Sequence, residues 1–378
     1  MLEPLIPASC RQASTRKVAI GDVVFGADEV PVIAGPCSVE PGYLSHATEV
    51  AAAGASVLRG CVFKPRTRPD AFQGLGAAGF DLLDAARSQT RLPIVAEPLG
   101  VDHITDLAAH VDALQIGTRS MQNTPLLRAA GRSGLPVILK RGMAATLDEW
   151  LSAAEYIFAE GNTQVILCER GIRTFETATR NTLDLSAIPV LRRRTDLPII
   201  VDPSHAAGTR DWVPALAMAA VAAGADGLLI EAHPEPDAAW SDAAQAIDIP
   251  TLHGIIRSLM VLTGIARTFD ATTIPAARGA IDRIDTAIAL LIERRAEVTA
   301  AVQAVKQKTG TPARDRRREQ QIAERVAALA PSIADSAERI TMAIIDACTQ
   351  AAAVKERAIR PTTGVGAESD PGDRRMAS

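Results

Sequence analysis

Short apolar runs alternate with longer alanine-rich stretches from about residue 31 to residue 266. Each run has the length of a buried parallel strand, and each stretch has helical character. Eight strand–helix units in about 235 residues predict a closed (β/α)8 TIM barrel. An open, doubly wound sheet is the alternative, but no GxGxxG motif follows the first run. The expected strands are residues 32–34, 56–58, 93–96, 113–116, 136–139, 164–167, 198–201 and 227–230.

The pattern changes on both sides of this region. Residues 17–30 alternate in strand fashion and predict a small hairpin, whereas we expect residues 1–16 to be disordered. Pro275 is expected to end the last barrel helix, within a linker at 267–275. From residue 276 to 309, Ile and Val recur every three or four positions, which predicts one long helix. Shorter helices are expected at 314–330 and 333–356, so the prediction is an all-α three-helix domain at 276–358 and a disordered tail at 359–378.

Composition and charge exclude several classes of protein. The 378 residues carry a net charge of −4, which argues against nucleic-acid binding. We find no run of 18 apolar residues and expect no membrane span. Five scattered cysteines give no disulfide framework, and the N-terminus has no signal-peptide layout, so we expect a cytoplasmic protein.

Polar or ionisable residues follow all eight expected strands. The most basic segment is 57–76, in which Arg59, Lys64, Arg66 and Arg68 are stiffened by prolines. Such a segment is either a solvated loop or an anion site. Active sites of these barrels lie at the C-terminal ends of the strands, so polar groups after every strand favour a phosphate or carboxylate site.

Cys37, His205 and Glu231 follow expected strands 1, 7 and 8, which are neighbours in a closed barrel. Together with Asp242 they offer one thiolate, one imidazole and two carboxylates. That mixture suits a divalent transition metal such as Mn, Co, Fe or Zn better than Mg or Ca. Each residue alone is a weak signal, because a single Cys near a strand end is more often core filler.

The motifs GPCSVE, LRGCVFKPRT, FQGLG, QIGTRSMQN, LKRG, ILCERGIRTFE, TRNTLDL, VDPSHAAG and IEAHPEP occur in this order along the chain. Residues 17–266 thereby closely resemble 3-deoxy-D-arabino-heptulosonate 7-phosphate (DAHP) synthase of the type I-beta subfamily. The resemblance implies condensation of phosphoenolpyruvate with erythrose 4-phosphate, the first step of the shikimate pathway.

The resemblance also implies roles for individual residues. The metal ligands would be Cys37, His205, Glu231 and Asp242. Lys64 or His233 would move protons, and the sequence does not choose between them. Related enzymes that make an eight-carbon sugar acid from arabinose 5-phosphate have Asn in the KPRT segment, so this segment favours the four-carbon aldehyde. Phosphoenolpyruvate would be held by Arg59, Lys64, Arg119, Lys140 and Arg170, and erythrose 4-phosphate by Lys64, Pro65, Arg66 and Thr67.

Cys61 is a departure, because relatives have a small residue such as Gly at this position. It is interpreted either as neutral packing or as a thiol near the metal that makes the enzyme sensitive to oxidation.

Charged residues interrupt the long C-terminal helix. Arg295 and Lys306 are eleven residues apart, which places them within about 20° of one another, and both are expected to face inward among the valines. Arg278 lies about 100° from them and would serve a neighbouring subunit. Asp315, Arg318 and Glu319 share one face of the next helix.

Residues 276–354 resemble the all-helical chorismate mutases, which are intertwined dimers. The resemblance implies at least a dimer through this domain, with Arg295 and Lys306 as catalytic groups. Chorismate or prephenate would be bound by Arg278, Arg295, Lys306, Asp315, Arg318 and Glu319.

The third helix departs from that family, which has a Ser and, four residues later, a Gln. Here the pair is Cys348 and Ala352 in one register, or Asp346 and Gln350 in another. Losing the Gln that meets the ether oxygen would weaken turnover and leave dicarboxylate binding possible.

Three hypotheses follow. The first is a bifunctional enzyme, DAHP synthase with chorismate mutase. In the second, the helical domain is a non-catalytic dimerisation module that senses prephenate or chorismate. Feedback inhibition is expected in either case, since the first barrel strand begins near residue 32 and leaves no room for an N-terminal regulatory domain. The third, a sugar-acid synthase using another aldehyde, is disfavoured by the KPRT segment.

Overall fold

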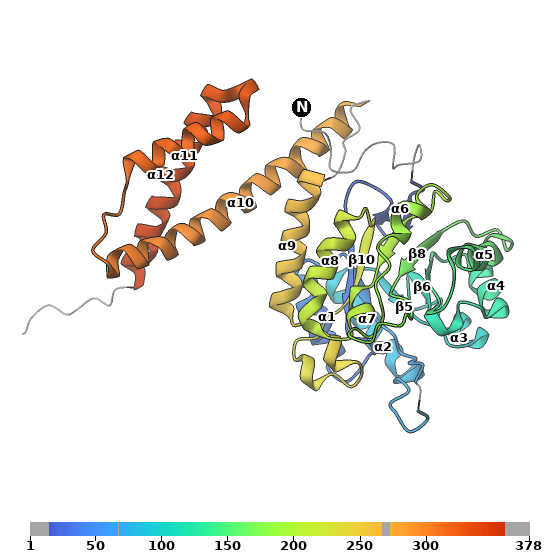
Figure 1. The fold of residues 1–378 in the computed structure, drawn as a ribbon. Helices are drawn as coiled ribbons and strands as arrows, with labels where there is room; N and C mark the ends of the chain where they lie inside the picture. The colour runs from blue at the N-terminus through green and yellow to red at the C-terminus, as the bar shows by residue number, and fades with distance from the viewer. Residues whose placement is uncertain (1–14, 67, 267–272, 360–378) are drawn as a thin grey trace, which may run out of the picture. The chain divides into compact units, whose positions relative to one another are not determined.

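The computed structural model describes residues 15–66, 68–266 and 273–359. Eight parallel strands form a closed barrel in the order β10-β3-β4-β5-β6-β7-β8-β9, which confirms the predicted TIM barrel (Figure 1). Each strand lies within two residues of its expected position. The strands are β3 (Val32–Gly35), β4 (Val57–Arg59), β5 (Ile94–Ala96), β6 (Ala113–Ile116), β7 (Val137–Lys140), β8 (Val165–Glu169), β9 (Ile199–Val201) and β10 (Gly227–Glu231).

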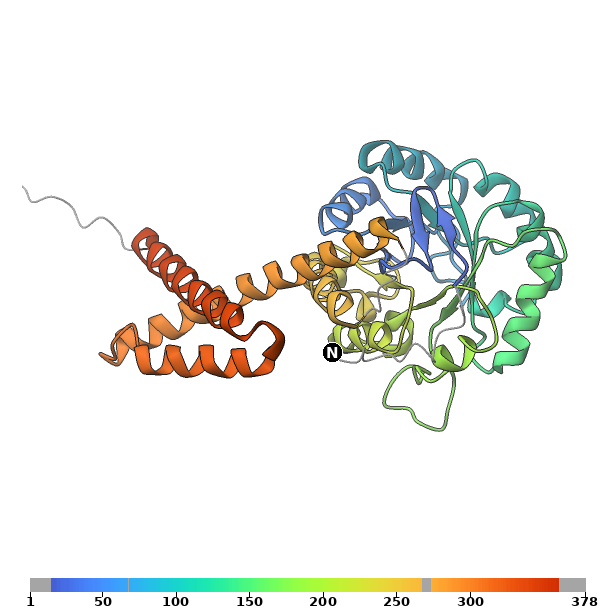
Figure 2. The ribbon, with the colours of Figure 1, turned by 90° about the horizontal axis from the view of Figure 1, so that it is seen from above.

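Every barrel strand is buried along its whole length, as parallel strands covered on both faces must be. Branched side chains such as Ile33, Ile138 and Ile200 fill the interior of the barrel. A second apolar cluster lies between the strands and the surrounding helices, which ring the barrel in Figure 2. The interior is therefore a packed core, and chemistry is confined to the barrel ends.

The predicted hairpin is confirmed as β1 (Val18–Ile20) paired antiparallel with β2 (Val23–Phe25). Phe25 belongs to the same apolar cluster as the barrel interior. Its ring lies 2.8 Å from where a Cβ on Gly227 would stand, at the start of β10. The hairpin thus closes the N-terminal end of the barrel, and the C-terminal end remains for the site.

Helices connect the strands and cover the outside of the barrel. The last of them, α9 (Ile249–Ala266), has the length and apolar composition of a membrane span. Its face with Leu252, Ile255 and Leu259 is buried, and it packs against α8 and α1, as the core helix of a barrel does. The helices are α1 (Tyr43–Ala52), α2 (Phe80–Thr90), α3 (Val101–Leu107), α4 (Thr124–Arg132), α5 (Leu147–Phe158), α6 (Ala187–Leu191), α7 (Pro203–Ala207), α8 (Val213–Ala222) and α9.

One boundary differs from the sequence prediction. The helix α9 ends at Ala266, and Pro275 is the second residue of the next helix, α10 (Ile274–Lys308). Proline lacks an N–H and has a fixed φ, so it fits the first turn of a helix as well as the residues after one. Pro275 therefore begins a helix here and does not end one.

The chain divides into two compact units, residues 1–287 and 288–378, and α10 crosses the boundary. In the second unit α11 (Arg316–Leu329) packs against α12 (Ala334–Ile359), close to the predicted helices. Residues 1–14 and 360–378 of the predicted disordered termini, and most of the predicted linker, lie outside the described residues. Arg16, which was expected to be disordered, pairs with Asp196 at 3.1 Å.

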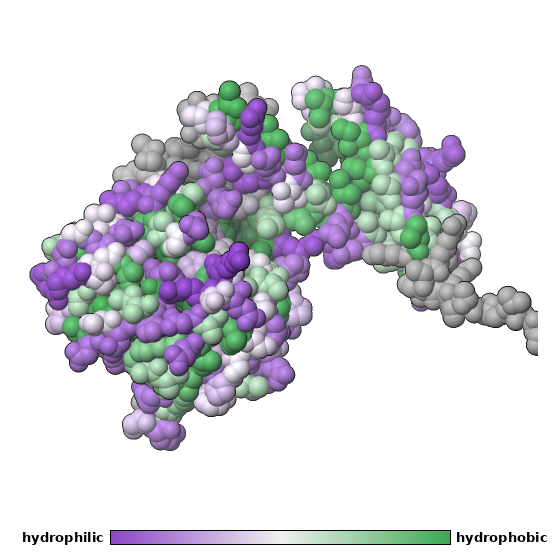
Figure 3. All heavy atoms as spheres, turned by 180° about the vertical axis from the view of Figure 1, so that it is seen from behind, coloured by the Kyte–Doolittle hydropathy of each residue, from purple (hydrophilic) through white to green (hydrophobic). Residues whose placement is uncertain are grey.

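The apolar stripe on α10 is exposed within the single chain. Val298 is 51% exposed and Val305 is 60% exposed, and hydrophobic residues are visible at the surface of the helical unit in Figure 3. A helix of 35 residues with an uncovered apolar face is incomplete by itself. This agrees with the expectation that it needs a partner.

Candidate active site and metal centre

A cavity of about 260 Å³ opens at the C-terminal ends of the barrel strands. Two carboxylates line it, Glu97 and Asp242, against a large excess of positive charge. Such a cavity suits ligands that carry more than one negative group. Its cationic residues are Arg59, Lys64, Arg66, Arg68, Arg119, Lys140, Arg170 and Arg180.

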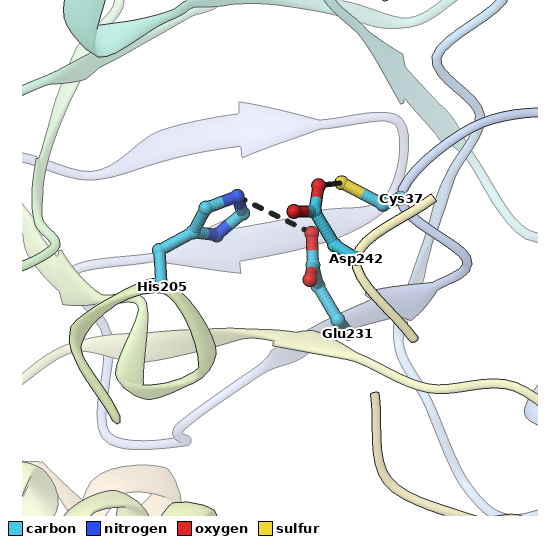
Figure 4. A group of neighbouring side chains, drawn as sticks. All are labelled: Cys37, His205, Glu231 and Asp242. Carbon is cyan, nitrogen blue, oxygen red and sulfur yellow. Dashed lines mark hydrogen bonds and ion pairs between the residues drawn. The ribbon is translucent and has the colours of Figure 1, made fainter. Parts of the chain in front are cut away.

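The four residues expected to bind a metal lie together beside this cavity. Their candidate ligand atoms all lie within 4.8 Å of one another. Cys37 Sγ donates to Asp242 Oδ2 at 3.0 Å, and His205 Nε2 lies 3.3 Å from Glu231 Oε1 (Figure 4). One sulfur, one imidazole nitrogen and two carboxylates form a donor set that fits a divalent transition metal.

The turn after β3 brings Cys37 to this position. Gly35 at the end of β3 has φ 147°, and a Cβ on it would lie 2.7 Å from the carbonyl oxygen of Arg59. Only glycine allows β3 and β4 to approach so closely. Cys37, two residues later, is 4% exposed.

Two cations neutralise the carboxylates of this group. Arg59 Nη1 lies 2.5 Å from Glu231 Oε1, and Lys64 Nζ lies 3.1 Å from Asp242 Oδ2 and also donates to Cys37 Sγ. Burial opposes ionisation of Glu231, but His205 and Arg59 outweigh it and lower its pKa to about 2. The pKa of Asp242 is also lowered, against burial, chiefly by Lys64. Both carboxylates are therefore ionised and ready to hold a cation.

Asp202 orients His205. It caps α7 by accepting from the backbone N–H of His205 at 3.0 Å, and its Oδ2 lies 2.7 Å from His205 Nδ1. Lys140 Nζ donates to the same oxygen at 2.6 Å. With Nδ1 turned toward Asp202, the free ligand atom of His205 is Nε2, which faces Glu231. Burial lowers the pKa of His205, against the opposing effect of the Asp202 and Glu231 carboxylates.

The KPRT segment lies at the rim of the cavity. Pro65 and Arg66 line it, and Arg119 Nη1 donates to the carbonyl oxygen of Pro65 at 3.0 Å. Further along the same loop, Phe72 packs edge-on against Trp240 with centroids 5.0 Å apart. Thr67 lies outside the described residues.

Of the described barrel residues singled out in the sequence, four do not line the cavity: Cys37 and Glu231 of the ligand cluster, His233 and Cys61. His233 is buried, and its Nε2 lies 2.6 Å from Glu40 Oε1. Cys61 is also buried and is not among the four clustered ligand residues.

Two residues that support the site, Arg180 and Gln245, were not predicted from the sequence. Arg180 Nη1 donates to Gln245 Oε1 at 2.7 Å and lies 3.4 Å from Asp242 Oδ1. Gln245 in turn donates to the second oxygen of Glu231. The TRNTLDL motif contains Arg180, but its loop position gave no sign that the side chain reaches Asp242.

Several predicted residues of the helical unit make polar contacts within that unit. Arg295 and Lys306 are half-buried, and they donate to the carbonyl oxygens of Ile344 at 3.5 Å and Ala313 at 3.0 Å. The valines near them are exposed in the single chain, so the expectation that both cations face inward among valines stays a prediction.

Glu319 of α11 and Arg314, which precedes this helix, form a pair that the sequence did not suggest. Glu319 is 9% exposed and accepts two hydrogen bonds from Arg314, at 3.0 and 2.7 Å. Arg314 also lies 2.7 Å from Asp346. Asp315 caps α11 by accepting from the backbone N–H of Arg318 at 3.0 Å, and the Arg318 side chain is exposed.

The two registers of α12 differ in burial. Cys348 and Ala352 are buried, and Cys348 Sγ lies 3.9 Å from the carbonyl oxygen of Ile292 on α10. Gln350 is exposed. Cys348 and Ala352 therefore share the inward face. Arg278 is exposed and lies in the first unit, whereas the other residues predicted to bind chorismate or prephenate lie in the second.

Comparisons with known proteins agree with both units. The sequence model of the DAHP synthetase I family matches residues 6–263, and that of chorismate mutase type II matches residues 277–352. A phospho-2-dehydro-3-deoxyheptonate aldolase of Thermotoga maritima is 47% identical over 247 residues, which cover 65% of this chain and 73% of the relative. A 2-dehydro-3-deoxyphosphooctonate aldolase of Bradyrhizobium diazoefficiens is 34% identical over 275 residues, covering 66% of this chain and 95% of the relative.

Solved structures give the same result for the barrel. The crystal structure of the Thermotoga maritima DAHP synthase superimposes with a TM-score of 0.63 at 46% identity, covering 65% of this chain and 73% of that one. A truncated form of the enzyme gives a TM-score of 0.61 at 43% identity, covering 65% and 91%. The chain therefore belongs to the DAHP synthetase I family and carries a chorismate mutase type II domain after the barrel.

Proposed function

We propose that the barrel condenses phosphoenolpyruvate with erythrose 4-phosphate and depends on a divalent transition metal held by Cys37, His205, Glu231 and Asp242. The observation that carries this proposal is the closeness of four S, N and O ligands to a cavity lined by cations. When bound, the metal supplies a Lewis acid that polarises the aldehyde oxygen.

The cavity residues bind and orient the two substrates. Arg59, Lys140 and Arg170 come from three different strand ends, so they can hold the carboxylate and phosphate of phosphoenolpyruvate at separate points. The remaining cations, with Pro65 and Arg66 at the rim, leave a second anion site for the phosphate of erythrose 4-phosphate.

Lys64 is the group we assign to proton transfer. Its ammonium lies against Cys37 and Asp242 and lines the cavity, whereas His233 is turned toward Glu40. Burial opposes its charge, but the acidic groups around it, including the Glu231 and Asp242 carboxylates, raise the pKa of Lys64. Lys64 therefore holds a proton at the place where the aldehyde oxygen gains negative charge.

The barrel reaction is tested by following phosphoenolpyruvate consumption with erythrose 4-phosphate and, separately, with arabinose 5-phosphate. We expect a higher kcat/KM with the four-carbon aldehyde, loss of activity after chelation, and recovery with Mn²⁺ or Co²⁺. Full activity after exhaustive chelation contradicts the metal dependence. A preference for arabinose 5-phosphate contradicts the choice of aldehyde and supports a sugar-acid synthase.

We further propose that the helical unit binds chorismate and rearranges it to prephenate as a homodimer. The uncovered apolar stripe on α10 supports a second copy of the chain as its partner, because eight Ile, Leu and Val side chains of α10 are each at least 43% exposed. Half-buried Arg295 and Lys306 supply two cations, which suits a dicarboxylate. Prephenate or chorismate bound there would inhibit the barrel.

The test of this second function is prephenate formation by the full-length protein and by Arg295→Ala, with Arg294→Ala as the matched control. Arg294 is the neighbouring residue, and its side chain is 74% exposed. Turnover lost only in Arg295→Ala supports catalysis. Chorismate binding without turnover supports the sensing module, and synthase rates unchanged by prephenate and chorismate contradict feedback inhibition. Sedimentation of the full chain as a monomer contradicts the dimer.

The described cysteines Cys37, Cys61, Cys168 and Cys348 are free and buried. This supports a reducing, cytoplasmic compartment as part of the proposal.

A further inference from the structure

Glu40 is a buried carboxylate that joins two loops at the C-terminal end of the barrel. It is 3% exposed, does not line the cavity, and follows Cys37 by three residues. Both of its oxygens accept from the loop after β10: Oε1 lies 2.6 Å from His233 Nε2, and Oε2 accepts from the backbone N–H of Trp240 at 2.9 Å. This loop carries Asp242.

The hydrogen bonds of His233 fix the direction of the contact with Glu40. The backbone N–H of Glu235 donates to His233 Nδ1 at 2.9 Å, so the ring proton of the neutral imidazole is on Nε2 and points to Glu40. A second link between the same loops joins the hydroxyls of Ser38 and Ser241 at 2.8 Å. The residues just after Cys37 are thus tied to the residues just before Asp242 by two separate links.

Asp242 needs such support because its backbone is strained. It has φ 53° and ψ 31°, and among the described non-glycine residues only Arg91 shares a positive φ. A left-handed residue with a side chain persists where its surroundings hold it. Here the two preceding residues, Trp240 and Ser241, are the ones tied to Glu40 and Ser38.

We infer that Glu40 is a positioning residue for the metal centre: through His233 and the Trp240 N–H it holds Asp242 in the conformation that presents its carboxylate to the ligand cluster. This inference rests on the proposed metal site. It assigns Glu40 and His233 to orientation of a ligand loop and leaves proton transfer to Lys64.

A second metal site is the competing reading, since Glu40, His46 and His233 offer ligand atoms within 4.8 Å of one another. The hydrogen bonds argue against it. His233 has no lone pair left, because Nδ1 accepts from the backbone and Nε2 carries the proton toward Glu40. His46 Nδ1 is 3.9 Å from Glu40 Oε1, beyond hydrogen-bond distance.

The experiment measures Co²⁺ binding to metal-free full-length protein by equilibrium dialysis, together with the thiolate-to-Co²⁺ absorption band that reports Cys37. We expect one tight Co²⁺ per chain in the wild type and a Kd about 10- to 100-fold weaker in Glu40→Ala. Glu40→Gln keeps one of the two acceptor oxygens, so we expect it to weaken Co²⁺ binding less than Glu40→Ala does. Glu49→Gln, which removes an exposed carboxylate on α1, leaves the Kd unchanged.

A double-mutant cycle shows whether Glu40 acts through Asp242. In the Asp242→Ala background, Glu40→Ala changes the Kd for Co²⁺ by less than about twofold, because the residue it holds is gone. The KM for phosphoenolpyruvate stays within about twofold of wild type in both Glu40 variants, which separates positioning from general loss of structure. Glu40→Gln alone carries the test if Glu40→Ala does not fold.

Any of three results would overturn the inference. These are an unchanged Kd for Co²⁺ in both Glu40 variants, equal weakening of Co²⁺ binding by Glu49→Gln, or a full additional loss of Co²⁺ affinity when Glu40→Ala is added to Asp242→Ala. A second Co²⁺ that disappears with His46→Ala also overturns it, in favour of the competing site. A wild type that binds no Co²⁺ is a different failure, because it removes the proposed metal dependence itself.

Discussion

Cys37 Sγ lies 3.0 Å from Asp242 Oδ2, although the two residues are 205 positions apart in the sequence. The thiol comes from the loop after the first barrel strand, and the carboxylate comes from the loop after the last. Burial raises the pKa of Cys37, so without a metal the protonated thiol donates to the carboxylate. In the proposed metal-bound enzyme, the metal would take the place of that proton.

The first prediction concerns this thiol. We expect Cys37→Ala to weaken Co²⁺ binding at least about 100-fold and to abolish synthase activity, because the loss removes a direct ligand. The measurements are the Co²⁺ Kd, the thiolate absorption band and the rate of phosphoenolpyruvate consumption. Cys61→Ala is the control, since Cys61 is equally buried and is not in the ligand cluster. Equal damage in both variants would show that Cys37 acts only through packing.

The second prediction concerns the Phe72–Trp240 contact, which joins the loop of the KPRT segment to the loop of Asp242. An aromatic pair contributes about 0.5–1.5 kcal/mol. We therefore expect Phe72→Ala to raise the KM for erythrose 4-phosphate about twofold to tenfold and to leave the KM for phosphoenolpyruvate unchanged.

Steady-state kinetics with each substrate varied in turn measure both constants. Phe175→Ala is the matched control, because Phe175 is 98% exposed and its removal should change neither KM. A parallel rise in both KM values after Phe72→Ala would instead indicate disorder of the whole barrel end.

The barrel and the closeness of three candidate metal ligands were predictable, because both follow from the positions of the strand ends. Cys37, His205 and Glu231 each come directly after an apolar run, and closure of the barrel brings those runs together. Arg180 and Gln245 were missed because they reach the site from the interior of long loops, whose course no periodicity predicts. His233 was placed in the site by sequence proximity to Glu231, and only the contact with Glu40 shows where its ring points.

The helix α12 and Pro275 show a second limit of prediction from sequence. The spacing of apolar residues predicts that α12 is a helix, but it does not choose between registers that differ by two residues. Burial does, because Cys348 is covered and Gln350 is exposed. A proline such as Pro275 occurs both just after the end of a helix and in the first turn of one. By itself it therefore indicates a helix boundary, but not whether a helix ends or begins there.

The third prediction is a pH dependence of stability. Arg141 Nη1 lies 2.9 Å from both Asp184 Oδ2 and Glu169 Oε2. Burial opposes ionisation of Asp184, but the Ser186 hydroxyl and Arg141 outweigh it and lower its pKa. An acid with a lowered pKa stabilises the fold above its unfolded pKa of about 3.9, and the stabilisation is lost as pH falls toward the folded pKa.

Asp184→Asn should therefore reduce the free energy of unfolding by about 1–3 kcal/mol at neutral pH. The difference from wild type should be constant down to about pH 5 and narrow below it. Urea unfolding of the barrel at a series of pH values measures this. Asp237→Asn is the control, because Asp237 pairs with Arg210 but is 93% exposed, and such pairs contribute about 0–1 kcal/mol. A difference that widens as the pH falls would contradict the assignment.

The last prediction concerns the mutase unit. Ala352 occupies the inward face of α12 one turn after Cys348, where the chorismate mutases it resembles have a Gln that meets the ether oxygen. Removing one such donor from an electrostatic site costs roughly 100- to 1,000-fold in kcat. We therefore expect slow chorismate turnover in the wild type and a rise in kcat of at least about tenfold in Ala352→Gln, measured as prephenate formation.

Ala351→Gln is the matched control, since Ala351 is the adjacent, exposed residue and its substitution should leave kcat unchanged. If Ala352→Gln binds chorismate as tightly as the wild type but turns over no faster, the missing amide is not what limits this unit, and its role as a sensor gains support.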